Sequence, residues 1–372
     1  MVVAVWSAGA VSCGELVERA LANNLELRAV GYEIDRAAAR HRGSGLRSNP
    51  EVGAEISKDG LLPRAERQYV ASVSFSQAFP VTARLRLEKA VTAVAIDAAR
   101  AEVADRARRL AGEVEEAFVE VQSAAAEIGL RRRQVALAEE LAAFVAKRHE
   151  VGEMSLAEVL GAKLQARTVK QEIVGLRISR ERQLAVLRVL VGAEPGEVIE
   201  PAGRRVLKSP ETGLGKVLPR RGDFVVADLQ ISKSGREVAL ERAKKWDDLT
   251  LGISVENERT TDEPEGRGND WFAGVGVSVP LPFWNDNRHV VEEKQAERAQ
   301  AIVAREALIR RIRGELAAAQ KEVGAYREMA AGELAEVREL AEQNLAEQEK
   351  QYKSGQGQLT DVLRAREQLL EL

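Results

Sequence analysis

The sequence has very few of the residues from which metal sites and catalytic sites are most often built. It contains one cysteine, Cys13, and three histidines, His41, His149 and His289, which lie far apart. A structural zinc site needs clustered Cys or His ligands, so the usual kind is excluded. A single cysteine also excludes a disulfide within the chain. Since no nucleotide-binding loop, nucleophile elbow or paired-histidine motif is present, we expect no enzyme, no metal site and no cofactor.

Neither sign of charge dominates the chain. Lys and Arg number 55 and Asp and Glu 58, which gives a formal net charge of −3. Proteins that bind nucleic acid usually present a basic face, so we expect no nucleic-acid partner. Long apolar runs are missing as well, because the hydrophobic start at 1–11 is shorter than the roughly 20 residues of a membrane-spanning helix. Three interpretations of this start are open. It is a cleaved signal with Cys13 as a site of acylation, an ordered N-terminal segment, or a mis-assigned start.

Proline is absent from two long stretches of the chain. All ten prolines lie outside 81–194 and 283–372. Proline in a helix interior costs about 3 kcal/mol, so its absence permits very long helices there. In both stretches apolar residues recur every seven residues, which is typical of coiled-coil packing. We predict helices over 82–149 and 286–351, each about 100 Å long at about 1.5 Å per residue. The apolar tracks are Ala107, Val114, Val121, Ile128, Val135 and Ala142 in the first stretch, and Ile302, Ile309, Leu316, Val323, Ala330 and Val337 in the second.

The second half of the chain repeats the first. A shift of 202 positions places Ala107 on Ile309, and a shift of 203 aligns residues 151–160 with 354–363. The order of features is the same in both halves, which indicates a tandem duplication. The predicted organisation is a first repeat at 1–191, a connecting segment at 192–222 and a second repeat at 223–372.

The second repeat ends early. The first repeat has a return helix predicted over 156–191, and a shift of 203 would carry its end to position 394. The chain stops at Leu372. We therefore expect either a shortened last helix or a fragment of a longer chain.

Each repeat has two short amphipathic segments before its long helix. Apolar residues alternate there with small or polar ones, a pattern typical of strands. A soluble sheet with one solvated face would show the same alternation. Two facts favour a membrane barrel: seven of the fifteen aromatic residues fall in this region, as in an interfacial girdle, and the long helices leave the sheet nothing to pack against. We predict that the residues facing lipid are Val52, Val73, Phe75, Leu251, Val275 and Val277.

The number of strands predicts an oligomer. Four strands cannot close a membrane barrel, which needs about eight, and open strand edges are not tolerated in lipid. Three chains would supply twelve strands. The charge-rich segments 58–68 and 257–270 are predicted to be loops in water. The predicted fold class is mainly α with membrane β: an internal duplication, long coiled-coil helices forming an α-helical barrel, and a 12-stranded β-barrel built by a trimer.

Two turns and one strand-to-helix segment show a resemblance to a known family. Residues 148–160 and 352–363 resemble the tips of TolC-like outer-membrane efflux channels of tripartite pumps, and 279–287 is similar to the heavy-metal, CzcC-like branch. The resemblance covers nearly the whole chain from Glu15. It implies a homotrimer in the outer membrane of a Gram-negative bacterium, with most of the chain in the periplasm. The implied partners are outer-membrane lipid, a periplasmic adaptor (membrane fusion) protein and an inner-membrane pump of the RND type, and the implied substrates are heavy-metal cations or drugs.

Both predicted tips combine a glycine with apolar residues. Gly152 and Gly355 let the chain reverse, since glycine adopts the left-handed conformation most easily. The apolar residues that follow either close the turn onto their own hairpin or offer a surface to an adaptor helix. The predicted docking residues are Val151, Gly152, Leu156, Val159, Leu160, Ser354, Gly355, Leu359, Val362 and Leu363.

The resemblance also implies a gate at the periplasmic end. In the family a tip carboxylate, a tyrosine and an arginine hold this end shut, and aspartates ring the opening. Glu158 falls at the carboxylate position, Tyr352 at the tyrosine and Asp361 at one ring aspartate. Gly357 stands at the arginine position and Arg364 replaces a second aspartate, so we expect the gate to be held differently. Two alternatives remain open, a periplasmic adaptor with a single hairpin and a soluble coiled-coil scaffold.

Overall fold

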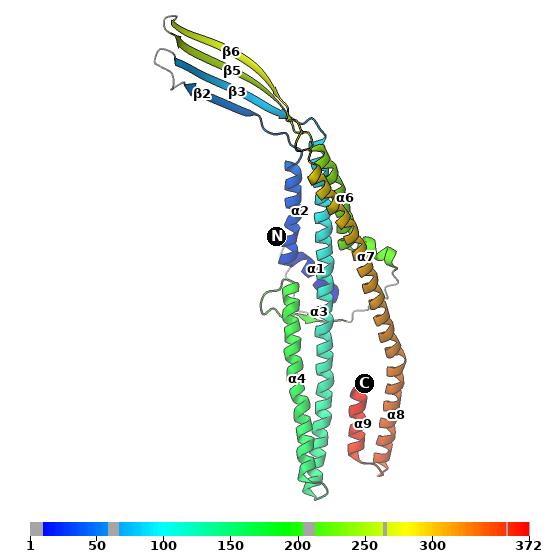
Figure 1. The fold of residues 1–372 in the computed structure, drawn as a ribbon. Coiled ribbons are helices and arrows are strands. Elements are labelled where there is room, and N and C mark those ends of the chain that lie inside the picture. Colours follow the sequence, from blue (N-terminus) through cyan, green and yellow to red (C-terminus); the bar gives the residue numbers. More distant parts are fainter. Residues whose placement is uncertain (1–9, 59–66, 204–212, 263–265, 355, 372) are drawn as a thin grey trace. The chain divides into compact units, whose positions relative to one another are not determined.

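The computed structural model describes residues 10–58, 67–203, 213–262, 266–354 and 356–371 (Figure 1). Two compact units make up the chain. The helical unit consists of Met1–Ala29, Asp105–Leu214 and Arg311–Leu372, and the sheet unit consists of Val30–Ala104 and Gly215–Arg310. Each unit contains segments from both predicted repeats.

The first proline-free stretch forms the predicted helical hairpin. Helix α3 is Arg84–Glu150 and helix α4 is Leu156–Leu190, within two residues of the predicted bounds. The heptad track of α3 is buried, with Val114 and Val121 at most 1% exposed. Further along, Ile128 of α3 packs in one cluster with Ile173 of α4. The seven-residue period therefore marks the seam of this hairpin.

The second stretch forms two helices where one was predicted. Helix α7 (Arg288–Ala331) and helix α8 (Glu333–Lys353) are separated by Gly332, whose φ is −108° and ψ is −89°. A β carbon at Gly332 would lie 3.1 Å from the carbonyl oxygen of Glu328. Since glycine has no such atom, the chain can kink here, and the prediction of one continuous helix over 286–351 was wrong at this residue.

The apolar track of the second stretch is mostly exposed. Helix α8 packs against the short helix α9 (Leu359–Glu371), which covers only its end. Val323 is 41% exposed and Leu340 is 58% exposed. The same heptad pattern that is buried in α3 thus lacks a partner in the described part of this chain.

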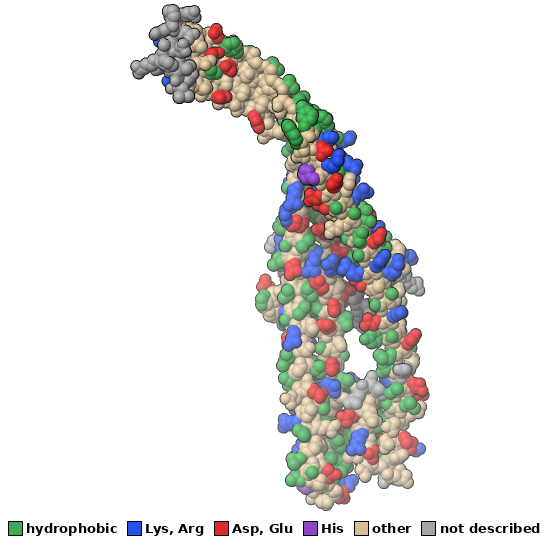
Figure 2. All heavy atoms as spheres, in the orientation of Figure 1, with side chains coloured by type: hydrophobic (Ala, Val, Ile, Leu, Met, Phe, Trp, Pro, Cys, Tyr) green, Lys and Arg blue, Asp and Glu red, His purple; other side chains and the backbone are tan. Residues whose placement is uncertain are grey.

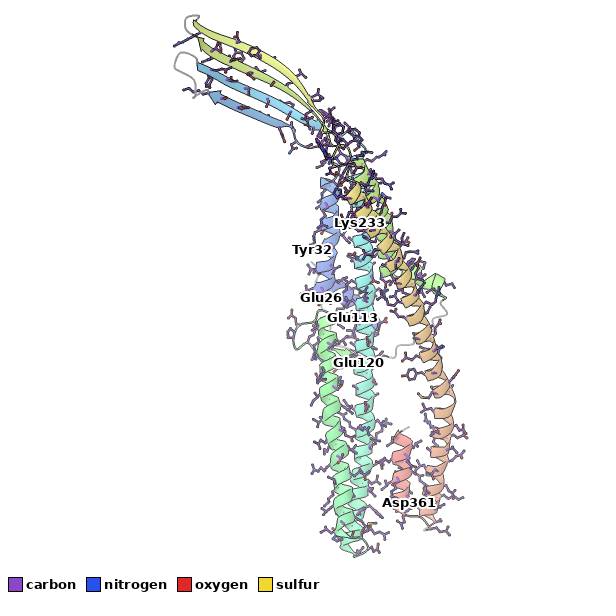
Figure 3. The ribbon with its side chains drawn as sticks, in the orientation of Figure 1. Glu26, Tyr32, Glu113, Glu120, Lys233 and Asp361 are labelled. Atoms are coloured by element: carbon purple, nitrogen blue, oxygen red, sulfur yellow. The ribbon has the colours of Figure 1, made fainter. Side chains whose placement is uncertain are left out.

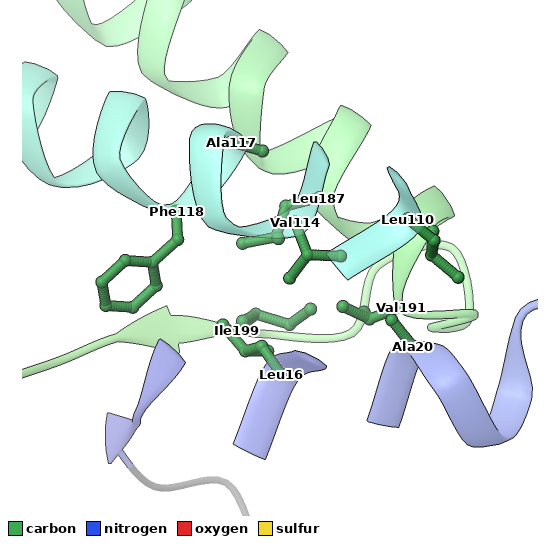
Figure 4. Close-up of a cluster of buried hydrophobic side chains, with 9 residues drawn as sticks. All are labelled: Leu16, Ala20, Leu110, Val114, Ala117, Phe118, Leu187, Val191 and Ile199. Atoms are coloured by element: carbon green, nitrogen blue, oxygen red, sulfur yellow. The ribbon is translucent and has the colours of Figure 1, made fainter. Parts of the chain in front are cut away.

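The helical unit has its main core where three helices meet a short strand (Figure 4). Helix α1 (Cys13–Asn23) begins with a capping box, in which the Ser12 amide donates to Glu15 Oε2 at 2.7 Å and the Glu15 amide donates to Ser12 Oγ. Cys13 is half-buried and packs against the core. The buried cluster consists of Leu16, Ala20, Leu110, Val114, Ala117, Phe118, Leu187, Val191 and Ile199.

A pair of two-residue strands beside this core was not predicted. Strand β1 (Ala10–Val11) pairs in parallel with strand β4 (Glu200–Pro201). They lie in the hydrophobic start and in the connecting segment, respectively. The connecting segment also contains α5 (Leu214–Val217) and the 3₁₀ helix η1 (Leu218–Arg220).

The sheet unit holds one four-stranded antiparallel sheet (Figure 1). The strand order is β2-β3-β5-β6, so each strand lies beside the next long strand in the sequence. Most of helix α2 and all of helix α6 belong to the sheet unit as well. The bounds are β2 Glu51–Lys58, β3 Arg67–Phe79, β5 Leu249–Asp262, β6 Gly266–Ser278, α2 Leu25–Gly43 and α6 Gly222–Ala243.

The strands are longer than predicted at the hairpin end of the sheet. Residues 257–270 were expected to form a loop, but β5 and β6 pair through nearly all of this segment. Asn257 Nδ2 donates to Asn269 Oδ1 at 2.7 Å, so polar side chains bond to each other across the pair. The loop prediction was wrong because polar residues were assigned to a turn, although their backbone continues the ladder. Of the predicted loop 58–68, Lys58 and residues 67–68 belong to strands and 59–66 lie outside the described residues.

One ion pair joins α1 to the segment that follows α4. Arg19 Nη1 and Nη2 donate to the two carboxylate oxygens of Glu197 at 2.5 and 2.7 Å, and the Arg19 side chain is 11% exposed. This hydrogen bond lowers the pKa of Glu197 below its ordinary value. Because the folded pKa is depressed, the pair stabilises the fold above the unfolded-state pKa, and this stability is lost as the pH falls through the folded pKa.

We predict that Glu197→Gln lowers stability at pH 7 by about 1 to 3 kcal/mol, since it leaves a mostly buried guanidinium without its counter-charge. Thermal unfolding of the detergent-solubilised protein followed by circular dichroism measures the change. The difference from wild type should shrink as the pH falls below about 4. Glu194→Gln, an exposed neighbour in the same segment, is the control. Equal melting of wild type and Glu197→Gln at pH 7 would contradict a stabilising pair.

Candidate functional site

One face of the sheet is apolar across all four strands. The ladder places Val52 opposite Phe75, Phe75 opposite Ile253, and Ile253 opposite Val275. Neighbouring rows are Ala54, Val73, Val255 and Ala273 on one side, and Gln77, Leu251 and Val277 on the other. All six residues predicted to face lipid therefore share this face, which we call the apolar face.

The opposite face carries mainly small and acidic side chains, with Val70 and Phe272 as larger apolar exceptions. One row across the sheet is Gly53, Ser74, Ser254 and Gly274. A β carbon at Gly53 would lie 2.7 Å from Ser74 Oγ, so the glycines allow these rows to pack closely. Figure 2 shows acidic side chains on the sheet. We call this the polar face.

The apolar face is uncovered in the chain. Val275 is 82% exposed and Val52 is 74% exposed, far more than a residue packed against a core. Among the described residues, none of the helices has the length and apolar character of a membrane span. From Phe79 to Tyr69 the apolar face of β3 covers 11 residues, the length that a tilted membrane strand needs.

The first tip, between α3 and α4, is fixed by local hydrogen bonds. Gly152 has a φ of +81°, as the sequence predicted for the reversal. The Glu153 amide donates to the Arg148 carbonyl at 3.0 Å, which closes the C-terminus of α3. The His149 ring lies 2.7 Å from the Met154 carbonyl oxygen. Helix α4 then begins with a capping box between Ser155 and Glu158.

The predicted docking residues of the first tip differ in how far their side chains are buried. Leu156 and Leu160 are each 58% exposed and lie one turn apart on α4, and Val151 is also exposed. Val159 is buried against its own hairpin. The exposed apolar surface of this tip therefore consists of Val151, Leu156 and Leu160.

The second tip, between α8 and α9, is built differently. Val362 and Leu363 are each 3% exposed, so they hold the hairpin together, and Ser354 caps the end of α8. Arg366 of α9 donates to Glu349 of α8 at 2.9 Å. Gly355 and the Leu359 side chain, also predicted to dock, lie outside the described residues.

The predicted gate residues lie at both tips. The Ser155 amide donates to Glu158 Oε2 at 2.7 Å, which lowers the pKa of Glu158 and engages it in its own capping box. Asp361 is half-buried near the start of α9 (Figure 3), while Tyr352 and Arg364 are exposed. A β carbon at Gly357, where the resemblance places an arginine, would lie 3.0 Å from the Tyr352 amide nitrogen. A larger residue does not fit there without a shift.

The described residues hold no group of three or more His, Cys, Asp or Glu that could bind a metal. An open cavity of about 460 Å³ between α3 and α4 is lined by Arg132, Arg177, Arg180 and Glu181 with Ala125 and Ile128. None of these is a nucleophile paired with a base.

The charged end of the sheet was not predicted from the sequence. Glu256, Glu258 and Asp270 lie on the polar face, while Arg259 and Arg267 lie on the apolar face. Four of them, Glu258, Arg259, Arg267 and Asp270, had been assigned to the loop 257–270. The available signal was the spacing of Glu256 and Glu258, which lie two positions apart with uncharged Asn257 between them and basic Arg259 next, as on alternating faces of a strand.

Comparisons with known proteins agree with this geometry. Pyoverdine export outer membrane protein OpmQ of Pseudomonas aeruginosa is 25% identical over 325 residues, covering 82% of this chain and 67% of that protein. The outer membrane protein VceC of Vibrio cholerae has a TM-score of 0.76 at 19% identity, covering 96% of this chain and 90% of that structure. CusC, described in a study of transmembrane channel formation, has a TM-score of 0.77 at 16% identity over 99% and 90% of the chains.

A family model described as outer membrane efflux protein matches residues 16–193 and 213–371. Members of this family are trimeric channels of the outer membrane, with a large helical part in the periplasm. They act as passive conduits in tripartite pumps with an adaptor and an inner-membrane transporter, and are not enzymes. The match covers most of the sequence, so the chain belongs to the outer membrane efflux protein family and is an efflux channel of the outer membrane.

Proposed function

We propose that three copies of this chain close one 12-stranded barrel, with the apolar face toward lipid and the polar face toward an open lumen. The observation that carries the proposal is the apolar row from Val52 to Val275, which is exposed on every strand. The exposed heptad positions of α7 and α8 support an assembly too, because neighbouring copies would cover them. The division into repeats at 1–191 and 223–372, joined by 192–222, gives the assembly its two helical hairpins per chain.

The partners in this proposal are an adaptor and an inner-membrane pump of the RND type. The exposed residues Val151, Leu156 and Leu160 of the first tip form a small apolar surface that suits an adaptor helix. The turn at 279–287 supports the heavy-metal branch, while the similarity to a protein named for pyoverdine export supports a larger solute. Transported heavy-metal cations or drugs pass through without being bound, because a wide conduit needs no selective pocket.

The barrel is tested by placing an arginine on each face of strand β6. Val275 lies in a central row of the apolar face, and Val275→Arg should cost about 2 to 4 kcal/mol near mid-membrane. Gly276 follows it on the polar face, with open space around a built β carbon, so Gly276→Arg should be tolerated. The measurement is the yield of heat-resistant trimers in outer membranes. If both arginines reduce the yield equally, the assignment of faces is wrong.

Docking is tested at the first tip. We predict that Leu156→Glu with Leu160→Glu abolishes efflux and site-specific cross-linking to the adaptor, while trimer yield stays unchanged, because the charges face solvent until docking. Ala157→Glu, an exposed position beside Leu156, is the matched control and should retain efflux. A parallel loss of trimers in the double variant would instead assign these leucines to assembly.

The gate proposal concerns Asp361. With the lumen-facing orientation that the family resemblance implies, three copies bring this residue together around the axis of the channel. Carboxylates in a constriction attract cations. Asp361→Ala should therefore weaken cation preference and reduce block by divalent cations in single-channel recordings. Arg364→Gln, one turn further along α9, should strengthen the cation preference. Normal trimers with unchanged selectivity in Asp361→Ala would remove this residue from the gate.

A further inference from the structure

The charged side chains of the sheet are sorted by face. Among the strand residues whose side chains are described, the ladder places every basic one on the apolar face, namely Lys58, Arg259 and Arg267. Every acidic one lies on the polar face: Glu51, Glu55, Glu256, Glu258 and Asp270. A solvated sheet has no reason for this separation, since water screens both signs equally on either face.

The three basic residues lie together at the hairpin end of the sheet. Lys58 pairs with Tyr69, and Tyr69 pairs with Arg259, so one row crosses β2, β3 and β5. Arg267 of β6 pairs with Thr261, two residues further toward the hairpin. We call Lys58, Arg259 and Arg267 the basic rim.

Trp271 lies between the basic rim and the apolar rows, and Tyr69 lies within the rim's own row. Trp271 pairs with Asn257 and is 70% exposed, and Tyr69 is 36% exposed. Tryptophan and tyrosine are enriched where a membrane meets water. Along the apolar face the aliphatic rows therefore come first, then the row of Trp271, and then the row in which Tyr69 lies between Lys58 and Arg259, as the order of acyl chain, interface and headgroup requires.

The basic rim is exposed, and no carboxylate among the described side chains forms an ion pair with it. Lys58, Arg259 and Arg267 are all exposed. The ion pairs among described residues include Arg19, Arg84 and Arg106 of the helices, but none of the three rim residues. Within the described part of the chain, their charge is therefore left for an external anion.

We propose that the basic rim binds the phosphate groups of lipid A in the outer leaflet. The inference rests on the proposed barrel. All four strands connect to helices at the end away from the rim, and the helices of this family lie in the periplasm, so the rim lies at the outer leaflet. Lipid A is a phosphorylated glycolipid of that leaflet, and guanidinium groups bind phosphate by paired, charge-assisted hydrogen bonds.

The test compares purified trimers of wild type and the variant Lys58→Gln, Arg259→Gln, Arg267→Gln. Native mass spectrometry measures binding of bisphosphorylated lipid A, with dephosphorylated lipid A and phosphatidylglycerol as the other probes. Wild type should bind bisphosphorylated lipid A at least about tenfold more tightly than either, because several cations act together. The triple variant should lose this preference.

Two matched variants separate the rim from charge in general. Arg182→Gln with Arg310→Gln and Lys321→Gln removes three exposed cations from helices, and Glu256→Gln with Glu258→Gln neutralises the polar face. Both should keep the preference for bisphosphorylated lipid A. Equal binding of phosphatidylglycerol by wild type, or an unchanged preference in the rim variant, would overturn the proposal.

The same samples distinguish a failure of the proposed barrel from a failure of the proposed lipid site. Each is first reconstituted and tested for ion conductance and for heat-resistant trimers. Conducting trimers without a preference for bisphosphorylated lipid A would refute the lipid site alone. An absence of conducting trimers in wild type would refute the barrel and the lipid site with it.

Discussion

The two open edges of the sheet determine what the rest of the chain must do. Among the described strands, β2 pairs with β3 alone and β6 with β5 alone. In lipid, each unpaired backbone amide or carbonyl costs several kcal/mol, because no water is present to bond with it. A single chain therefore cannot place this sheet in a membrane. Since the number of strands is even and all pairings are antiparallel, β2 and β6 run in opposite directions, and identical copies joined edge to edge continue the same pattern until the ring closes.

Closure of the proposed barrel also explains why the side chains on the two faces of the sheet differ in size as well as in polarity. Branched and aromatic side chains on the apolar face meet a fluid surface that accepts any shape. In the proposed barrel the polar face turns inward, where bulky side chains would fill the lumen. Ser254 Oγ lies 2.8 Å from a β carbon built at Gly274, so the row of glycine and serine is already closely packed. Small residues on this face keep a passage open, in keeping with a conduit.

The sequence predicted those elements whose pattern repeats over many residues. The heptads of α3 and the alternation in β3 each contain enough repeats to specify both the element and its apolar side. Strands β1 and β4 were missed because two residues have no period, and their pairing joins segments almost 190 positions apart. The kink at Gly332 was missed because one glycine is tolerated in most helices at a cost of about 1 kcal/mol. Among the docking residues, Leu160 and Val159 are alike in type, and only the packing of the hairpin shows that one is exposed and the other buried.

The two tips of the predicted repeats differ in chemistry. The first tip is rigid by itself: Gly152 ends one helix, and Ser155 with Glu158 begins the next. Because Glu158 already accepts these hydrogen bonds, its charge is engaged locally, and what the tip presents outward is apolar. The second tip is closed by the packing of Val362 and Leu363. Arg364 is exposed at its surface, and Asp361 is half-buried. On the proposed assembly this separates the two tasks of a channel end, with docking at the first tip and control of ions at the second.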